Sequence, residues 1–149
     1  MKVIGKAWKI MPRGMRIWLA RRTQSKFTIS AGAIVTNDRG EVLLLDHYLR
    51  PASGWGVPGG FLTAGEQPEA ALRRELLEET GLEIKNVTLY RMRTLQRHIE
   101  MIYLAEADGE ARVLSREIRR LAWFAVENMP PEMGLDQQFL IRRALGSGD

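Results

Sequence analysis

Apolar residues recur along the chain with two spacings, one typical of strands and one typical of helices. Residues 27–35 and 41–47 are rich in small, β-branched and leucine side chains and predict two strands. The Asn-Asp-Arg-Gly segment at residues 37–40 is typical of a turn, so we expect these strands to form a hairpin. Residues 50–60 hold two prolines and four glycines and predict a loop, with at most a short strand near residues 55–57. Three further strands are expected at residues 83–93, 96–107 and 119–125.

Helical spacing is clearest in residues 67–80. Pro68 suits the first turn of a helix, alanines and leucines fall on one side, and Gly81 is typical of the position after a helix end. A final helix is predicted at residues 137–145, with Asp136 as its N-cap. Because strands alternate with two main helices, we expect an α+β domain in which helices cover a mixed sheet.

A shorter amphipathic helix is predicted at residues 12–22. Pro12 is placed in its first turn, and Met15, Trp18 and Leu19 fall on one side of it. We expect this helix to cap the core or to form part of a dimer contact.

Charge is distributed unevenly between this region and the rest of the chain. Residues 1–26 contain 8 of the 22 lysine and arginine residues and no acidic residue, whereas the whole chain has a net charge of only +4. Such a segment suits nucleic acid, anionic lipid or an acidic partner surface, and the alternative is a solvated helix face. Trp8 and Trp18 beside these charges keep a peripheral membrane role open.

The composition excludes several kinds of site. A chain of 149 residues is long enough for one domain with a substantial core, and it contains no cysteine, which excludes disulfides, thiol nucleophiles and zinc–thiolate sites. With two histidines, a histidine-rich zinc site is not expected. No segment approaches the roughly 18 apolar residues of a membrane span. The absence of cysteine is typical of a reducing compartment, and we expect a cytoplasmic protein.

Three acidic residues stand out in the predicted helix at residues 67–80. Glu75, Glu78 and Glu79 occupy positions i, i+3 and i+4, which places them within an arc of about 100° on the helix surface. Three like charges in one arc repel one another unless a positive charge compensates. Clustered carboxylate oxygens suit Mg²⁺ or Mn²⁺, and the alternative is a solvated acidic face.

The segment around these glutamates resembles the Nudix box, G-x5-E-x7-R-E-U-x-E-E-x-G-U, in which U is aliphatic. Residues 60–82 match every defined position at the required spacing, with Gly60, Glu66, Arg74, Glu75, Leu76, Glu78, Glu79, Gly81 and Leu82. Seven single-residue requirements at roughly 7% usage each give a chance match of about 1 in 10⁸ at a given start. The preceding Trp-Gly-Val-Pro-Gly at residues 55–59 is similar to the family's lead-in, and the resemblance covers residues 27–130.

The resemblance implies a fold and an activity. It implies an α/β/α sandwich around a mixed sheet, in a Nudix hydrolase domain at residues 27–149 that follows a basic extension at residues 1–26. It also implies metal-dependent hydrolysis of a phosphoanhydride bond in a nucleoside diphosphate linked to another group. Two alternatives stay open: hydrolysis of pyrophosphate at the 5′ end of an RNA, and a catalytically silent module that only binds nucleotides. A homodimer is a further possibility.

The resemblance also assigns roles to the box residues. It implies that Glu75, Glu78 and Glu79 are metal ligands together with the backbone carbonyl of Gly60. A box glutamate, Glu78 or Glu75, is a candidate general base.

Two further roles concern the support of these ligands and a base outside the box. Arg74 is expected to hold a carboxylate by paired hydrogen bonds, and Glu66 to support the helix start. Since Arg74 lies about 100° from its chain neighbour Glu75, we expect it to reach Glu78 or Glu66 instead. Glu100 and Glu117 are candidates for a base outside the box.

Substrate contacts are less specific in the sequence. Three aromatic residues near the expected entrance, Tyr48, Trp55 and Phe61, are candidates for stacking on a base, with core or loop packing as the alternative. Several arginines are candidates for contacts to phosphate or sugar groups, namely Arg50, Arg91, Arg93 and Arg97. Arg91 and Arg93, two residues apart on a predicted strand, share one face.

Overall fold

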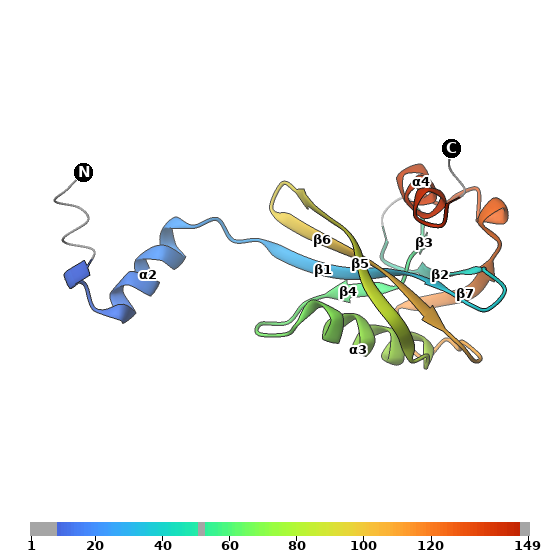
Figure 1. Ribbon diagram of the computed structural model, residues 1–149, viewed down its shortest axis with the longest axis horizontal. Coiled ribbons are helices and arrows are strands. Elements are labelled where there is room, and N and C mark those ends of the chain that lie inside the picture. The colour runs from blue at the N-terminus through green and yellow to red at the C-terminus, as the bar shows by residue number, and fades with distance from the viewer. Residues whose placement is uncertain (1–8, 51–52, 147–149) are drawn as a thin grey trace.

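Figure 1 shows a computed structural model that describes residues 9–50 and 53–146, with a mixed sheet between two helices and a third helix set apart. The strands are β1 Thr28–Thr36, β2 Val42–His47, β3 Trp55–Gly56, β4 Gly59–Phe61, β5 Ile84–Leu95, β6 His98–Ala107 and β7 Ile118–Phe124. The helices are α2 Arg13–Thr23, α3 Pro68–Thr80, the 3₁₀ turn Val126–Asn128 and α4 Leu135–Ala144. The expected α+β sandwich is therefore confirmed.

Strand β1 is the centre of the sheet. It runs parallel to β6 along its whole length, and its other side pairs antiparallel with β4, where Gly32 faces Gly59. The hairpin predicted between β1 and β2 exists only at its turn end, where Thr36 pairs with Val42. The hairpin prediction was wrong for most of both strands. Strands β6 and β4 occupy the two edges of β1, and β2 instead pairs with β7 and β3.

Three local predictions also need correction. The loop predicted for residues 50–60 contains a second short strand, β4, because the glycines there let its backbone pass close to β1. A Cβ on Gly59, whose φ is +147°, would overlap the carbonyl oxygen of Ala31. The N-cap of α4 is Gly134 rather than Asp136, which lies in the first turn. Likewise Pro12 is the N-cap of α2, which begins at Arg13.

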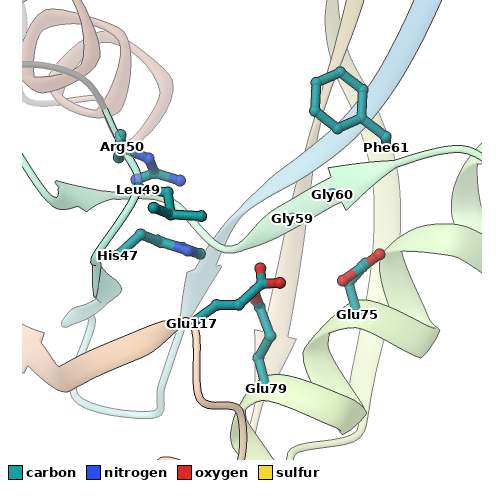
Figure 2. A pocket seen from close by; sticks show the side chains of 9 residues that line it. All are labelled: His47, Leu49, Arg50, Gly59, Gly60, Phe61, Glu75, Glu79 and Glu117. Atoms are coloured by element: carbon teal, nitrogen blue, oxygen red, sulfur yellow. The ribbon is translucent and has the colours of Figure 1, made fainter.

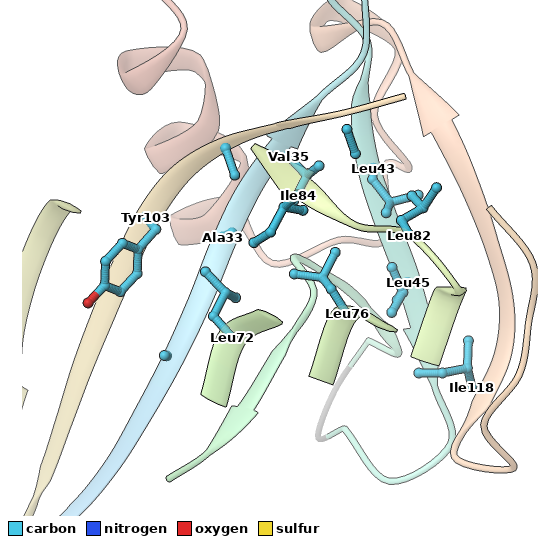
Figure 3. Close-up of a cluster of buried hydrophobic side chains, with 13 residues drawn as sticks. Ala33, Val35, Leu43, Leu45, Leu72, Leu76, Leu82, Ile84, Tyr103 and Ile118 are labelled. Carbon is cyan, nitrogen blue, oxygen red and sulfur yellow. The ribbon is translucent and has the colours of Figure 1, made fainter. Parts of the chain in front are cut away.

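Two hydrophobic cores lie on opposite faces of the sheet. The core shown in Figure 3 joins the sheet to α3, and it contains Leu43 and Leu45 of β2 together with Leu72 and Leu76 of α3. The other core joins the sheet to α4 and contains Val42, Leu44, Leu140 and Ile141 among others. Strand β2 thus sends alternate side chains into each core, which explains why its apolar run is continuous.

Helix α2 is not part of either core. None of its residues is buried, and Figure 1 shows it beyond the end of β1, away from the sheet. The expectation that it caps the core was therefore wrong; its Trp18 is 56% exposed. Trp8 lies outside the described residues. Among residues 9–50 and 53–146, no helix is both long enough and apolar enough to cross a bilayer.

Candidate active site

A cleft of about 530 Å³ opens where α3 faces β4 and the loops beside β2 and β7 (Figure 2). Its lining residues come from four separate parts of the chain: His47, Leu49, Arg50, Gly59, Gly60, Phe61, Glu75, Glu79 and Glu117. Carboxylates approach from α3 and from the loop before β7, the Arg50 guanidinium approaches from the segment after β2, and His47 lies at the end of that strand. The cleft therefore has an acidic side and a basic side.

The packing of α3 turns two of its glutamates toward this cleft. Leu72 and Leu76, four residues apart, are fully buried against the sheet. Glu75 comes three residues after Leu72, and Glu79 comes three residues after Leu76. Each glutamate therefore lies about 60° from its leucine around the helix axis. The leucine contacts consequently fix the rotation of the helix, and with it the direction of both carboxylates.

Gly60 lies directly against one of these carboxylates. A Cβ built at Gly60 would be 2.5 Å from Cδ and Oε1 of Glu75, closer than real carbon atoms approach. A side chain at this position would push Glu75 out of place. The observed position of the Glu75 carboxyl group therefore depends on a glycine at residue 60.

Arg74 contacts three glutamates of the box at once. Its Nε and Nη2 donate to the two oxygens of Glu66 at 2.9 and 3.2 Å, while Nη1 donates to Glu75 at 2.8 Å and reaches Glu78 at 3.4 Å. We expected Arg74 not to contact Glu75, its neighbour in the chain, and this was wrong. The arginine side chain is long enough to span the roughly 100° between the two positions on the helix. Hydrogen bonds from Arg74 and from the Thr63 backbone lower the pKa of Glu66 to about 2.

Glu79 is the most unusual ionisable group in the cleft. The residue is only 5% exposed, and its Oε2 has no hydrogen-bond partner among the described residues. Burial and the nearby charge of Glu75 raise the pKa of Glu79 to about 7, although the Arg50 guanidinium opposes the shift. A buried acceptor without a donor is costly, and a cation at this oxygen would offset the cost.

The other predicted acids divide between the cleft and the surface. Glu117 lines the cleft, and Figure 2 shows its side chain directed toward that of Glu79. Glu78 is outside the lining, since its side chain is 61% exposed and turned to Arg74. Glu100 is paired with Arg93 on the neighbouring strand. The structure therefore brings Glu117 to the box carboxylates and leaves Glu100 away from them.

The donor set fits a hard divalent cation. Glu75, Glu79 and Glu117 offer carboxylate oxygens, and one oxygen of Glu79 is buried without a partner. In the part of the chain that the structure describes, no three acidic or histidine side chains stand close enough together to form a finished metal site. Metal binding would then require these side chains to move closer together.

Two cleft residues, His47 and Leu49, were missed by the sequence analysis. His47 ends a buried strand, a position that gives no chemical signal without the fold. Burial, followed by the charge of Arg50, lowers the pKa of His47 to about 4, so the imidazole is neutral near pH 7. Its Nε2 is buried without a partner among the described residues.

Arg50 forms the basic side of the cleft. Its Nη2 donates to the carbonyl of Val57 at 3.2 Å, while Nη1 is buried without a partner among the described residues. The guanidinium fills the space beside Gly56, where an added Cβ would overlap Nη1 and lie 2.6 Å from Cζ. Gly56 therefore gives Arg50 room to face the acidic side of the cleft.

The remaining predicted contacts lie in different environments. Phe61 is 65% exposed and lines the cleft, with its ring edge-on to His98 at 5.7 Å between centroids. Trp55 is instead buried in the α4-side core, edge-on to Phe124 at 5.2 Å. Its size and apolar ring account for that position, and it is not among the residues that line the cleft.

Tyr48 and the two strand arginines lie outside the cleft lining as well. Tyr48 is 57% exposed, with the Arg119 guanidinium 4.8 Å from its ring centroid. Arg91 is exposed on β5, and Arg93 is held by Glu100.

Comparison with known proteins gives a consistent result. A family model described as NUDIX domain matches residues 26–144. The chain is 32% identical over 101 residues to an NAD-capped RNA hydrolase NudC of Vibrio parahaemolyticus, covering 66% of this chain and 39% of that protein. It is 45% identical over 64 residues to a putative 8-oxo-dGTP diphosphatase 2 of Mycobacterium tuberculosis, covering 41% and 43% of the two chains. The chain thus spans less than half the length of these relatives.

A solved structure agrees over most of the chain. The MutT NUDIX hydrolase from Burkholderia pseudomallei superposes with a TM-score of 0.69 at 28% identity. The match covers 78% of this chain and 97% of that one.

The buried carboxyl of Glu79 predicts how stability changes with pH in metal-free buffer. Its pKa is about 7 in the folded protein against an ordinary 4.5, so the folded protein keeps a proton that the unfolded chain releases. The stabilisation linked to this proton is present below pH 4.5 and is lost as the pH rises through 7. His47 acts in the opposite sense, because its pKa falls from 6.5 to about 4.

A comparison of the parent with Glu79→Gln isolates Glu79, since His47 is common to both proteins. As the pH rises from about 5 to about 8, the free energy of unfolding of the parent should fall by on the order of 3 kcal/mol relative to that of the variant. Urea denaturation in the presence of a chelator measures both. A difference that is the same at the two pH values would contradict a buried, protonated carboxyl.

The contacts of Arg74 predict a loss of metal affinity in Arg74→Lys. Lysine has no planar fork and cannot hold Glu66 while contacting Glu75. We expect Mn²⁺ affinity to fall at least roughly tenfold, about 1.4 kcal/mol, with the fold retained. Arg73→Lys is the matched control, because Arg73 pairs with Glu69, donates to the backbone carbonyl of Ile84 and contacts none of the box glutamates. Equal Mn²⁺ affinity in the parent and both variants, measured by calorimetric titration, would show that Arg74 does not organise the ligands.

Proposed function

The chain belongs to the Nudix hydrolase family, and on that premise we propose that it hydrolyses a phosphoanhydride bond in a nucleoside diphosphate linked to another group. The observation that carries the proposal is the Glu79 carboxyl group, which lies buried in the cleft with an unpartnered oxygen and with Glu75 and Glu117 beside it. Such a cluster is unfavourable by itself, and its charge suits a metal bound together with a diphosphate.

The box carboxylates are assigned to the divalent metal on which the family generally depends. Glu75 and Glu79 would hold it, with the more exposed Glu78 and the Gly60 carbonyl oxygen as further ligands. Carboxylate and carbonyl oxygens suit Mg²⁺ or Mn²⁺. When bound, the ion polarises the phosphoryl oxygens and neutralises charge that develops on them.

Glu117 is assigned as the general base. Its carboxylate enters the cleft from the loop before β7 and lies near that of Glu79 (Figure 2). There it can accept a proton from the water that attacks phosphorus. The bond from that phosphorus to the bridging oxygen breaks, and the bridging oxygen leaves on the other phosphate. Glu78, the alternative base, is held toward Arg74 and solvent.

The basic side of the cleft is assigned to the substrate. The unpartnered Nη1 of Arg50 is suited to donate to a diphosphate oxygen. The neutral His47 beside it adds a hydrogen-bonding group without adding charge. Phe61, exposed at the edge of the cleft, is placed to stack on a base or sugar.

The second candidate substrate is the 5′ end of an RNA. The chain is 31% identical over 108 residues to an RNA pyrophosphohydrolase of Actinobacillus succinogenes, covering 72% of this chain and 52% of that protein. The basic segment at residues 1–26 is the feature of this chain that favours it. A silent binding module is disfavoured, because Glu75 and Glu79 are both present in the cleft. A homodimer and a cytoplasmic location also stay predictions.

The proposal predicts that Glu79→Gln abolishes most of the activity. The amide keeps the shape of the side chain and removes the ligand charge, so we expect at least a hundredfold loss in turnover, roughly 3 kcal/mol of transition-state stabilisation. The substrate is found first, by screening nucleoside diphosphate derivatives and 5′-triphosphate RNA with Mg²⁺ and Mn²⁺ and weighing the products by mass spectrometry. Glu69→Gln, on the exposed side of the same helix, is the control and should retain parent turnover. A Glu79→Gln protein with parent turnover would overturn the metal assignment.

The contact between Arg50 and Gly56 predicts that two different variants share one defect. Arg50→Gln removes the cation, and Gly56→Ala displaces it, because the new Cβ would occupy the position of Nη1. Both should raise KM at least roughly tenfold, about 1.4 kcal/mol, while the metal dependence of the rate is unchanged. Gly14→Ala, where a Cβ meets nothing within 4 Å, is the control. If the KM of Arg50→Gln equals that of the parent, Arg50 does not bind the substrate. If only Gly56→Ala has the KM of the parent, the space beside Gly56 is not needed for the function of Arg50.

A further inference from the structure

Helix α2 carries large apolar side chains that remain about half exposed or more exposed to solvent in the described chain. Met15 and Trp18, on one side of the helix, are 54% and 56% exposed, and Ile10 just before the helix is 83% exposed. Ile17, on the other side of the helix, is 43% exposed. Water contact on several neighbouring apolar groups is unfavourable, at about 25 cal/mol per Å² of apolar surface. This arrangement points to a partner that buries them.

The charge around these side chains has one sign. Residues 1–26 contain no aspartate or glutamate, and α2 itself carries Arg13, Arg16, Arg21 and Arg22. No ion pair joins these four arginines to any residue that the structure describes. The partner that complements this segment is therefore anionic.

Apolar and cationic groups are combined on the same helix. Met15, Trp18, Leu19 and Arg22 follow the i, i+3, i+4 and i+7 spacing of one side, whereas Arg13 and Arg16 lie away from it. The Arg22 guanidinium lies 5.4 Å from the centroid of the Trp18 ring. Tryptophan is favoured at the boundary between lipid chains and headgroups, and arginine side chains there extend toward lipid phosphates.

We propose that α2, with the basic residues around it, binds the surface of an anionic lipid bilayer and lies in the plane of that surface. The apolar side would enter the headgroup boundary, and the arginines would contact the phosphates. Each lysine or arginine near such a surface contributes about 1 kcal/mol at moderate salt. An RNA would satisfy the arginines but leave the apolar side in water, and a second copy of this helix would bring like charges together.

The placement of α2 is compatible with an unhindered active site. In Figure 1 the helix lies beyond the far end of β1, and none of its residues lines the cleft. Membrane binding and hydrolysis are then separable, so α2 variants should keep the rate on a small substrate.

Sedimentation of the whole 149-residue chain with vesicles tests the proposal. Vesicles of phosphatidylcholine alone are compared with vesicles in which roughly a third of the lipid is phosphatidylglycerol. We expect binding to the anionic vesicles at least roughly tenfold tighter than to the neutral ones, weakening as salt is raised. It should be accompanied by a blue shift of tryptophan emission.

Two variants of α2, both of which keep its net charge, test whether the apolar side takes part in vesicle binding. Met15→Ser with Trp18→Ser should weaken vesicle binding at least roughly tenfold, about 1.4 kcal/mol, and remove part of the blue shift. A variant with the four arginines of α2 changed to lysine keeps the charge and should bind within about threefold of the parent. Circular dichroism and the hydrolysis rate check that each variant is folded.

Three outcomes would overturn the proposal. One is equal binding to neutral and anionic vesicles. Another is anionic-vesicle binding that the Met15→Ser and Trp18→Ser changes leave intact, because the apolar side would then have no part in it. The third is an absence of vesicle binding, together with salt-sensitive binding of a single-stranded RNA, which would assign the basic segment to nucleic acid.

Discussion

The packing of Leu72 and Leu76 against the sheet is the contact on which the candidate active site depends. Both side chains are fully buried, and a helix held on that stripe cannot rotate about its axis without exposing them. The carboxylates of Glu75 and Glu79 are consequently fixed in direction by apolar contacts on the adjacent side of the same helix. The hydrophobic core thus positions the charged groups, although none of its members enters the cleft.

Keeping several carboxylates together has an electrostatic cost that two arginines partly offset. Arg74 ties Glu66, Glu75 and Glu78 together at the solvent side of the box, where its own side chain is about one-third exposed. Arg50 acts from the opposite side, where it is more deeply buried and opposes the rise in the pKa of Glu79. The residual cost falls on Glu79, whose unpartnered oxygen marks the place where additional positive charge would be most stabilising.

Glycines provide the space that this arrangement needs. Gly59 lets β4 pass close to β1, Gly60 leaves room for Glu75, and Gly56 leaves room for Arg50. In each case a single methyl group would overlap an atom of a residue that is not a chain neighbour of the glycine. The glycine-rich segment before α3 is therefore a set of close contacts, and its short strands β3 and β4 belong to the sheet.

The sequence by itself determined the elements whose signal is local. The helix at residues 67–80 and its end at Gly81 were predicted almost to the residue, because helical periodicity and a glycine with a φ of +73° depend on near neighbours. The spacing of the box identified the family, and it placed Glu75 and Glu79 on one side of that helix. The tertiary structure alone decided which distant residues join them. Arg50, His47 and Glu117 reach the cleft because β2 pairs with β7, and the sequence around each of them gives no sign of that pairing. The tertiary structure also decided that Glu117 lines the cleft whereas Glu100 does not, and that Trp55 is buried in the core. Burial and contacts between residues far apart in the sequence follow from the order of the strands in the sheet.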